Sequence, residues 1–218
     1  MRLATAIYLI VGLINIYAQF VGDLTINQFT KPILMPVLIY LVFVKADGFV
    51  NLPRLLLALA LIFAWIGDML LLMQGEELYF LGGLGSFLIM QVLYTLVFYK
   101  SMQSPALPKS NIIIPSLIGF VVIAYGAFHY AGIMWIPVVI YALCILTMLA
   151  FALNRQSETS NQSFLLTTVG AALFVISDSL IGVNKFIEEI PYAPFLIMAT
   201  YIPAQYLIMQ GVMIHEKN

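Results

Sequence analysis

Two aspartates stand inside long apolar segments of the sequence, one in residues 66–70 (IGDML) and one in 176–180 (ISDSL). An aspartate at the centre of a membrane helix costs roughly 2.5–3.5 kcal/mol, so it usually faces a bundle interior or a water-filled cavity. Two carboxyl groups in one dry site divide their roles, one protonated and the other ionised. Asp68 and Asp178 are therefore predicted catalytic residues for acid/base chemistry. The alternative is that both are structural and hydrogen-bond neighbouring helices.

The composition indicates where these residues lie. The chain has 218 residues, of which 63% are hydrophobic and 9% charged, and its mean hydropathy is +1.04. Such values are typical of an integral membrane protein and exclude a soluble enzyme. A net charge of −1 offers no basic face for phosphates, so no nucleic-acid partner is expected. The single cysteine, Cys144, excludes a disulfide framework.

Eight apolar segments are long enough to cross a hydrocarbon core of roughly 30 Å. The fold class is therefore an all-α integral membrane protein, and 1–218 forms one transmembrane domain. The first segment ends without a signal-cleavage site, so it is expected to stay in the mature protein. The predicted spans are 3–21, 26–45, 53–73, 78–99, 112–128, 133–153, 163–183 and 192–214.

The distribution of Lys and Arg predicts cytoplasmic N- and C-termini, because cytoplasmic loops carry the excess of positive charge. Only Lys31 and Lys185 then fall on the outer side. The second span must begin near Thr25 rather than at Pro32 to reach across the bilayer, which places Lys31 a turn or more inside it. The residues assigned to the inner side are Arg2, Lys45, Arg54, Lys100, Lys109, Arg155 and Lys217.

The two aspartate segments align when the chain is shifted by about half its length, which predicts a parallel 4+4 repeat with halves of about 1–105 and 106–218. Both aspartates lie about 22 Å from the cytoplasmic start of their spans, in the outer half. Polar residues at similar depth are the predicted substrate-binding set, although each Asn, Gln or Tyr could instead join helices. The set is Lys31, Lys185, Asn184, Gln91, Tyr94, Tyr201, Gln205 and Asn15.

Other chemistries lack the residues they need. His129 and His215 lie far in depth from the aspartates, so a Ser-His-Asp triad and a His-rich metal site are not expected. No glycine-rich phosphate loop occurs, since the glycines at 82, 83 and 85 suit close helix packing better. The sequence thus predicts neither a metal nor a cofactor.

The sequence resembles the YhhN-like lysoplasmalogenases, small eight-helix membrane proteins, over nearly its whole length. The resemblance rests on the segments TKP at 30–32, FAWIGDMLL at 63–71, GAALFVISDS at 170–179 and AQY at 204–206. It departs at Gln91, where the family often has His. If that His shuttles protons in relatives, Gln91 can only hydrogen-bond, which affects the expected rate or substrate preference.

The resemblance implies hydrolysis of the vinyl ether of lysoplasmalogens, with a lysophospholipid substrate held within the bilayer of a bacterial inner membrane. One aspartate would act as the acid, and the other would stabilise the cation or activate water, by analogy with glycosidase carboxylates. Lys31 and Lys185 are the candidates to hold the phosphate.

Two other functions are open to the same residues. A proton-coupled small-molecule or lipid transporter also has intramembrane Asp and Lys, and it should contain helices broken at matching places in both halves. Pro203 is expected to break the eighth span, but the fourth span has no matching proline. A structural lipid-binding or scaffold protein is the third possibility, and it predicts no turnover.

Overall fold

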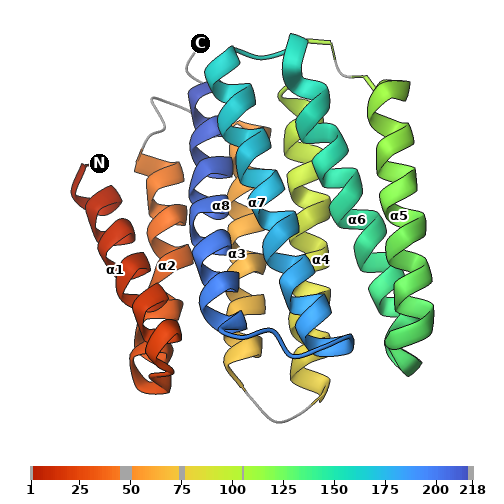
Figure 1. The fold of residues 1–218 in the computed structure, drawn as a ribbon. Coiled ribbons are helices and arrows are strands. Elements are labelled where there is room, and N and C mark those ends of the chain that lie inside the picture. Colours follow the sequence, from red (N-terminus) through yellow and green to blue (C-terminus); the bar gives the residue numbers. More distant parts are fainter. Residues whose placement is uncertain (1, 45–50, 74–76, 105, 216–218) are drawn as a thin grey trace. The chain divides into compact units, whose positions relative to one another are not determined.

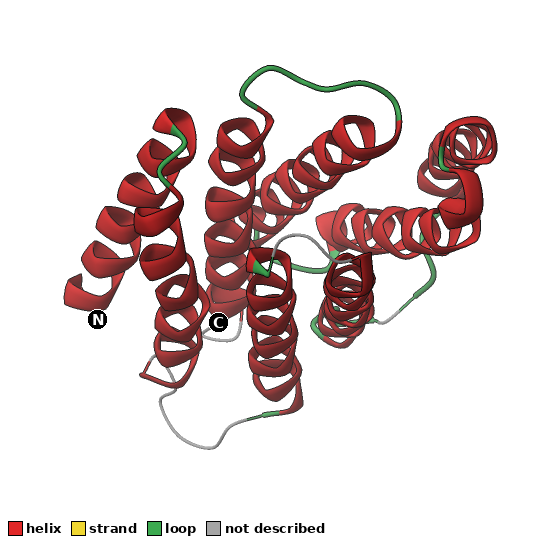
Figure 2. Ribbon diagram, turned by 90° about the horizontal axis from the view of Figure 1, so that it is seen from below, coloured by secondary structure: helices red, strands yellow, loops and turns green. Residues whose placement is uncertain are grey.

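The computed structural model describes residues 2–44, 51–73, 77–104 and 106–215, which form helices joined by loops and contain no strand (Figures 1 and 2). Eight of the helices in these ranges are long and apolar enough to cross a membrane, which confirms an all-α integral membrane protein. Lys45 and Lys217, used for the predicted orientation, lie outside the described residues. The eight are α1 (Arg2–Val21), α2 (Leu24–Val44), α3 (Leu52–Leu72), α4 (Glu77–Lys100), α5 (Ser110–Tyr130), α6 (Trp135–Asn154), α7 (Asn161–Phe186) and α8 (Ala193–His215).

Helix α2 begins close to the start expected for the second span. Gly22, with φ of 74°, takes the left-handed conformation that ends α1. The carboxylate Oδ1 of Asp23 then accepts a hydrogen bond of 3.0 Å from the backbone N–H of Ile26, which caps the new helix. Because α2 begins at Leu24, Lys31 lies about two turns inside it.

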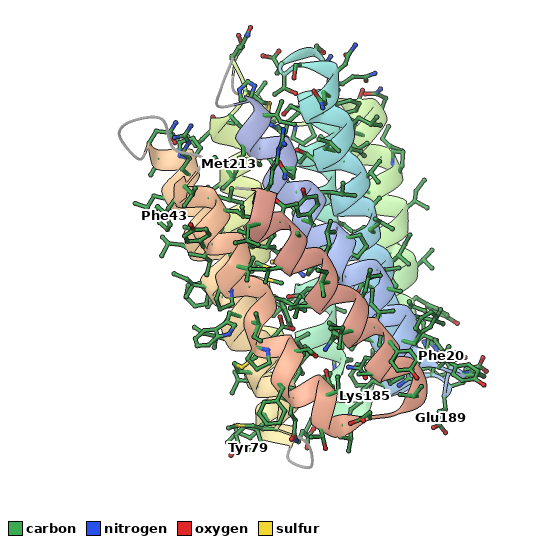
Figure 3. The ribbon with its side chains drawn as sticks, turned by 90° about the vertical axis from the view of Figure 1, so that its left-hand side faces the viewer. Phe20, Phe43, Tyr79, Lys185, Glu189 and Met213 are labelled. Atoms are coloured by element: carbon green, nitrogen blue, oxygen red, sulfur yellow. The ribbon has the colours of Figure 1, made fainter. Side chains whose placement is uncertain are left out.

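The chain folds as two compact units, residues 1–97 and 98–218. The first holds α1 to α3 and most of α4, and the second holds the end of α4 and α5 to α8. In the first unit Phe43 lies at the opposite end from Tyr79, and in the second Met213 lies at the opposite end from Lys185 and Glu189 (Figure 3).

Small residues let the helices of the first unit approach closely. A Cβ added at Gly67 of α3 would lie 3.0 Å from the Phe87 ring of α4, and one at Gly83 would lie 2.9 Å from the Leu71 side chain. The hydroxyl of Ser86 also donates a 2.7 Å hydrogen bond to the carbonyl of Phe63. Glycine packing and hydroxyl hydrogen bonds are the usual means of joining membrane helices, and here they join α3 to α4.

In the second unit α7 and α8 pack with their backbones in contact. A Cβ at Gly170 would lie 2.9 Å from both the carbonyl oxygen of Ala204 and the backbone nitrogen of Ile208. The helix α8 runs unbroken from Ala193 to His215, so the expected break at Pro203 is wrong. Membrane helices tolerate proline where neighbouring groups satisfy the freed backbone, and α8 has α7 along its side.

A buried arginine ties together the end of the second unit opposite the α7–α8 loop. Arg155 follows α6 and is fully buried, and its guanidinium donates hydrogen bonds to Thr167 (2.5 Å) and Ser163 (3.0 Å) of α7. It also lies 5.6 Å from the centre of the Phe98 ring. The Ser163 hydroxyl in turn donates to the Gly211 carbonyl of α8 at 2.7 Å. Arg155 and Ser163 together therefore connect α6, α7 and α8.

We expect Gly211→Ala to lower the free energy of unfolding by about 1–3 kcal/mol, the usual cost of overpacking. Its new Cβ would contact the Thr167 hydroxyl and lie 2.7 Å from the Thr167 backbone nitrogen, which cannot move without shifting α7. Thermal unfolding in detergent measures the change. Gly126→Ala is the matched control, because its Cβ enters open space. Equal unfolding temperatures for the two variants would contradict this account of α7–α8 packing.

Candidate functional site

Asp68 is held in an ion pair with the predicted binding residue Lys31. The lysine Nζ on α2 lies 3.4 Å from the aspartate Oδ1 on α3, and the two side chains are only 10% and 2% exposed. A buried charge in a membrane helix needs a partner because no water solvates it. The first unit thus compensates its intramembrane carboxylate with an ammonium from the preceding helix.

A second contact between the same helices sets this register. Pro36 has no backbone N–H. The carbonyl of Pro32, one turn earlier, therefore has no donor within the helix. The indole Nε1 of Trp65 on α3 donates to that carbonyl at 3.0 Å. Trp65 and Asp68 are three residues apart and share a face of α3, and Lys31 precedes Pro32. Pro36 therefore leaves an acceptor for Trp65 beside Lys31, the residue that pairs with Asp68.

Helix α1 supports the same part of α2 through a buried amide. The Nδ2 of Asn15 donates to the Asn27 side chain at 3.0 Å and to the Thr30 hydroxyl at 2.8 Å. Asn15 is fully buried, and Thr30 immediately precedes Lys31. The structure thus places this predicted binding residue between helices, where its amide nitrogen joins α1 to α2.

Asp178 has a partner that the sequence analysis missed. The hydroxyl of Tyr141 on α6 donates a hydrogen bond to the aspartate Oδ2 on α7, and both residues are partly buried. A tyrosine in the interior of a span is not explained by the aromatic belt at membrane surfaces. The repeat alignment also contained a signal, since Tyr141 stands as far beyond Lys31 as Asp178 stands beyond Asp68, by 110 residues.

The same shift relates a second pair of contacts. Gly67 packs against the ring of Phe87, and the Ser177 hydroxyl donates at 3.1 Å to the carbonyl of Ile197. Residues 67 and 177, like 87 and 197, are 110 positions apart. In each unit, the residue before the aspartate thus contacts the fourth long helix, and the aspartate contacts the second.

The other predicted binding residues are distributed over both units. Gln91 and Tyr94 of α4 are fully buried three residues apart, and Gln205 of α8 is fully buried. Tyr201, also buried, has its ring 5.9 Å from that of Phe174.

Asn184 and Lys185 lie near the end of α7, beyond Asp178. The Oδ1 of Asn184 accepts a 2.9 Å hydrogen bond from the backbone N–H of Ile190, and Lys185 is exposed. Among the described residues, no group of three or more His, Cys, Asp or Glu is arranged to hold a metal ion.

Comparisons with known proteins agree on one family. Residues 26–212 match the model of the YhhN family. The chain is 33% identical over 157 residues to lysoplasmalogenase TMEM86A of Homo sapiens, covering 68% of this chain and 61% of that protein. It is 29% identical over 149 residues to lysoplasmalogenase TMEM86B of Homo sapiens, covering 68% and 59%. It is 27% identical over 186 residues to TMEM86B of Sus scrofa, covering 82% and 72%.

The chain therefore spans about 60% of the length of the two human proteins. No solved structure matches it.

We expect Lys31→Met to lower the free energy of unfolding by about 3–5 kcal/mol, because it leaves the buried Asp68 carboxylate without its counterion. The double variant Lys31→Met/Asp68→Asn should recover much of this loss, since it removes the uncompensated charge. Chemical or thermal unfolding in detergent measures both. Lys109→Met is the control, because Lys109 is exposed. If Lys31→Met were as stable as Lys109→Met, the ion pair between Lys31 and Asp68 would not stabilise the fold.

Proposed function

Because the chain belongs to the YhhN family, we propose that it hydrolyses the vinyl ether bond of lysoplasmalogens. The products are a fatty aldehyde and a glycerophospho-base, and the substrate lies in the bilayer. The observation that carries the proposal is that each unit holds one aspartate on a membrane-spanning helix with a polar partner from the helix before it. The names of the relatives at 27–33% identity support the same reaction.

The reaction needs one proton donor and one negative charge. Protonation of the β-carbon of the vinyl ether gives an oxocarbenium ion, water adds to the carbon bonded to oxygen, and the hemiacetal collapses to aldehyde and alcohol. We assign the acid to Asp178, because the tyrosine hydroxyl beside it is neutral and, unlike an ammonium, does not require the carboxylate form. We assign cation stabilisation or water activation to Asp68, because its ion pair with Lys31 requires the carboxylate form.

We further propose that the two units are copies of a parallel repeat. The two pairs of contacts related by 110 residues support it. We also propose that both termini face the cytoplasm of a bacterial inner membrane. The excess of Lys and Arg in alternate loops supports this orientation.

The transporter alternative expects helices broken at matching positions of both halves. The unbroken course of α8 through Pro203 gives it no support. Incubating the purified protein with a lysoplasmalogen and with its ester analogue, and assaying free aldehyde, distinguishes hydrolase from transporter and scaffold. Release of aldehyde from the vinyl ether alone is the expected result.

Asp68→Asn and Asp178→Asn should each reduce aldehyde release by at least about a hundredfold, the scale of lost acid/base catalysis. The amide keeps the size of the side chain but removes its titratable proton and charge. Asp23→Asn is the control, because Asp23 caps α2 and asparagine caps equally well. Asp178→Asn and Asp23→Asn should purify as folded protein. Asp68→Asn leaves the Lys31 ammonium without its counterion, so its turnover is measured also in the Lys31→Met/Asp68→Asn variant. Near-normal turnover by either test variant would make that aspartate structural.

Tyr141→Phe should lower kcat by about tenfold and leave KM nearly unchanged. Asp178 becomes a carboxylate as it gives up its proton, and a hydrogen bond from the hydroxyl to this developing charge is worth about 1.5–3 kcal/mol. Tyr125→Phe, at an exposed tyrosine of α5, is the matched control for loss of a hydroxyl. A raised KM at constant kcat would instead indicate that Tyr141 contacts the substrate.

A further inference from the structure

A pocket opens in the loop that joins α7 to α8. Its volume is about 430 Å³, and it is lined by Asn184, the loop residues 189–192 and the first two residues of α8. Glu189 and Lys185 lie at this same end of the second unit (Figure 3). The pocket is therefore placed where a lipid headgroup would lie if α7 crosses the membrane.

Hydrogen bonds fix the shape of this loop. The backbone N–H of Glu188 donates to the Val183 carbonyl at 3.1 Å, and that of Ala193 donates to the Ile190 carbonyl at 3.1 Å. The side chain of Asn184 accepts a hydrogen bond from the backbone N–H of Ile190 and so holds the loop against the end of α7. Pro191 and Pro194 restrict the backbone further. The pocket is thus formed before any ligand binds.

The lining suits an organic cation. The Glu189 carboxylate supplies a negative charge, and the Tyr192 ring supplies a π face, which together attract an ammonium group. Asn184 and the loop backbone add polar groups, whereas Ile190 and the two prolines offer apolar surface for methyl or methylene groups. These features match an ethanolamine or choline amine better than a phosphate or an acyl chain.

The axial distance along α7 from Asp178 to the pocket residue Asn184 is comparable with the length of such a substrate. Asn184 lies six residues beyond Asp178 on the same helix, an axial distance of about 9 Å. Nine single bonds separate the vinyl ether oxygen from the amine nitrogen of a lysoplasmalogen. An extended chain advances about 3.5 Å per three bonds, so these nine bonds span about 10 Å. The substrate is therefore long enough for the axial part of the path from Asp178 to the pocket, and over the same six residues the side-chain direction turns by about 120° around α7.

We propose that the pocket formed by Asn184, Glu189 and Tyr192 binds the amine of the lysophospholipid headgroup and selects amine-bearing substrates. This assignment rests on the proposed function. It leaves the phosphate to a cation near the pocket, and the exposed Lys185, which follows Asn184 on α7, is the basic residue beside it.

Three substrates with the same alkenyl chain test the assignment: the ethanolamine and choline lysoplasmalogens and the analogue ending in a bare phosphate. Glu189→Gln should raise KM about fivefold for the two amines, the scale of an exposed ion pair, and leave KM for the phosphate analogue unchanged. Tyr192→Leu should raise KM for the choline substrate most, because a quaternary ammonium has no N–H to hydrogen-bond and depends on aromatic contact.

Glu188→Gln is the matched control, because the neighbouring Glu188 does not line the pocket and should behave as wild type with all three substrates. An equal change in KM for the phosphate analogue, or equal effects of the two glutamate variants, would overturn the pocket assignment alone. Failure of the wild-type protein to release aldehyde from any of the three would overturn the proposed function instead. Glu189→Asp, which keeps the charge, should retain the preference for amines.

Discussion

The hydrogen bond from Trp65 to the carbonyl of Pro32 is the contact on which the first unit's polar centre depends. A helix carbonyl normally has a donor four residues later, and here that position is Pro36, which has none. An unsatisfied carbonyl is costly in lipid, so α2 must lie where α3 can supply a donor. Once the indole is in place, the register leaves Lys31 beside Asp68. A local defect in one helix thereby determines the neighbour of a buried charge.

Each unit provides a partner for its intramembrane aspartate, but the two partners differ in chemistry. In each, the second long helix supplies the partner of the aspartate on the third, through an ammonium in one case and a phenol in the other. An ammonium compensates charge, whereas a hydroxyl orients a carboxyl and leaves it able to exchange a proton. This difference is the physical basis for giving the two aspartates different roles in the proposed reaction.

The second unit is built differently at its two ends. At the end near Arg155, a guanidinium and a hydroxyl connect α6, α7 and α8, and Gly211 brings the helix backbones into contact. At the other end the chain turns through a loop with a preformed pocket, in which Tyr192 takes φ of 58°. A left-handed tyrosine costs about 1–3 kcal/mol and persists only where surrounding contacts impose it.

The sequence by itself determined the eight helices, the early start of α2 and the two intramembrane aspartates, because hydropathy, caps and charge act over a few residues. Tertiary structure decided the partners. Lys31 was expected to hold the substrate phosphate, and the structure pairs it with Asp68. Tyr141, the hydrogen-bond partner of Asp178, was not expected. Which faces of two helices meet depends on packing rather than on hydropathy. Pro203 was expected to break α8, yet packing along α7 accommodates it. The pocket beside Asn184 was equally hidden, since a loop acquires its shape only from the helices that it connects.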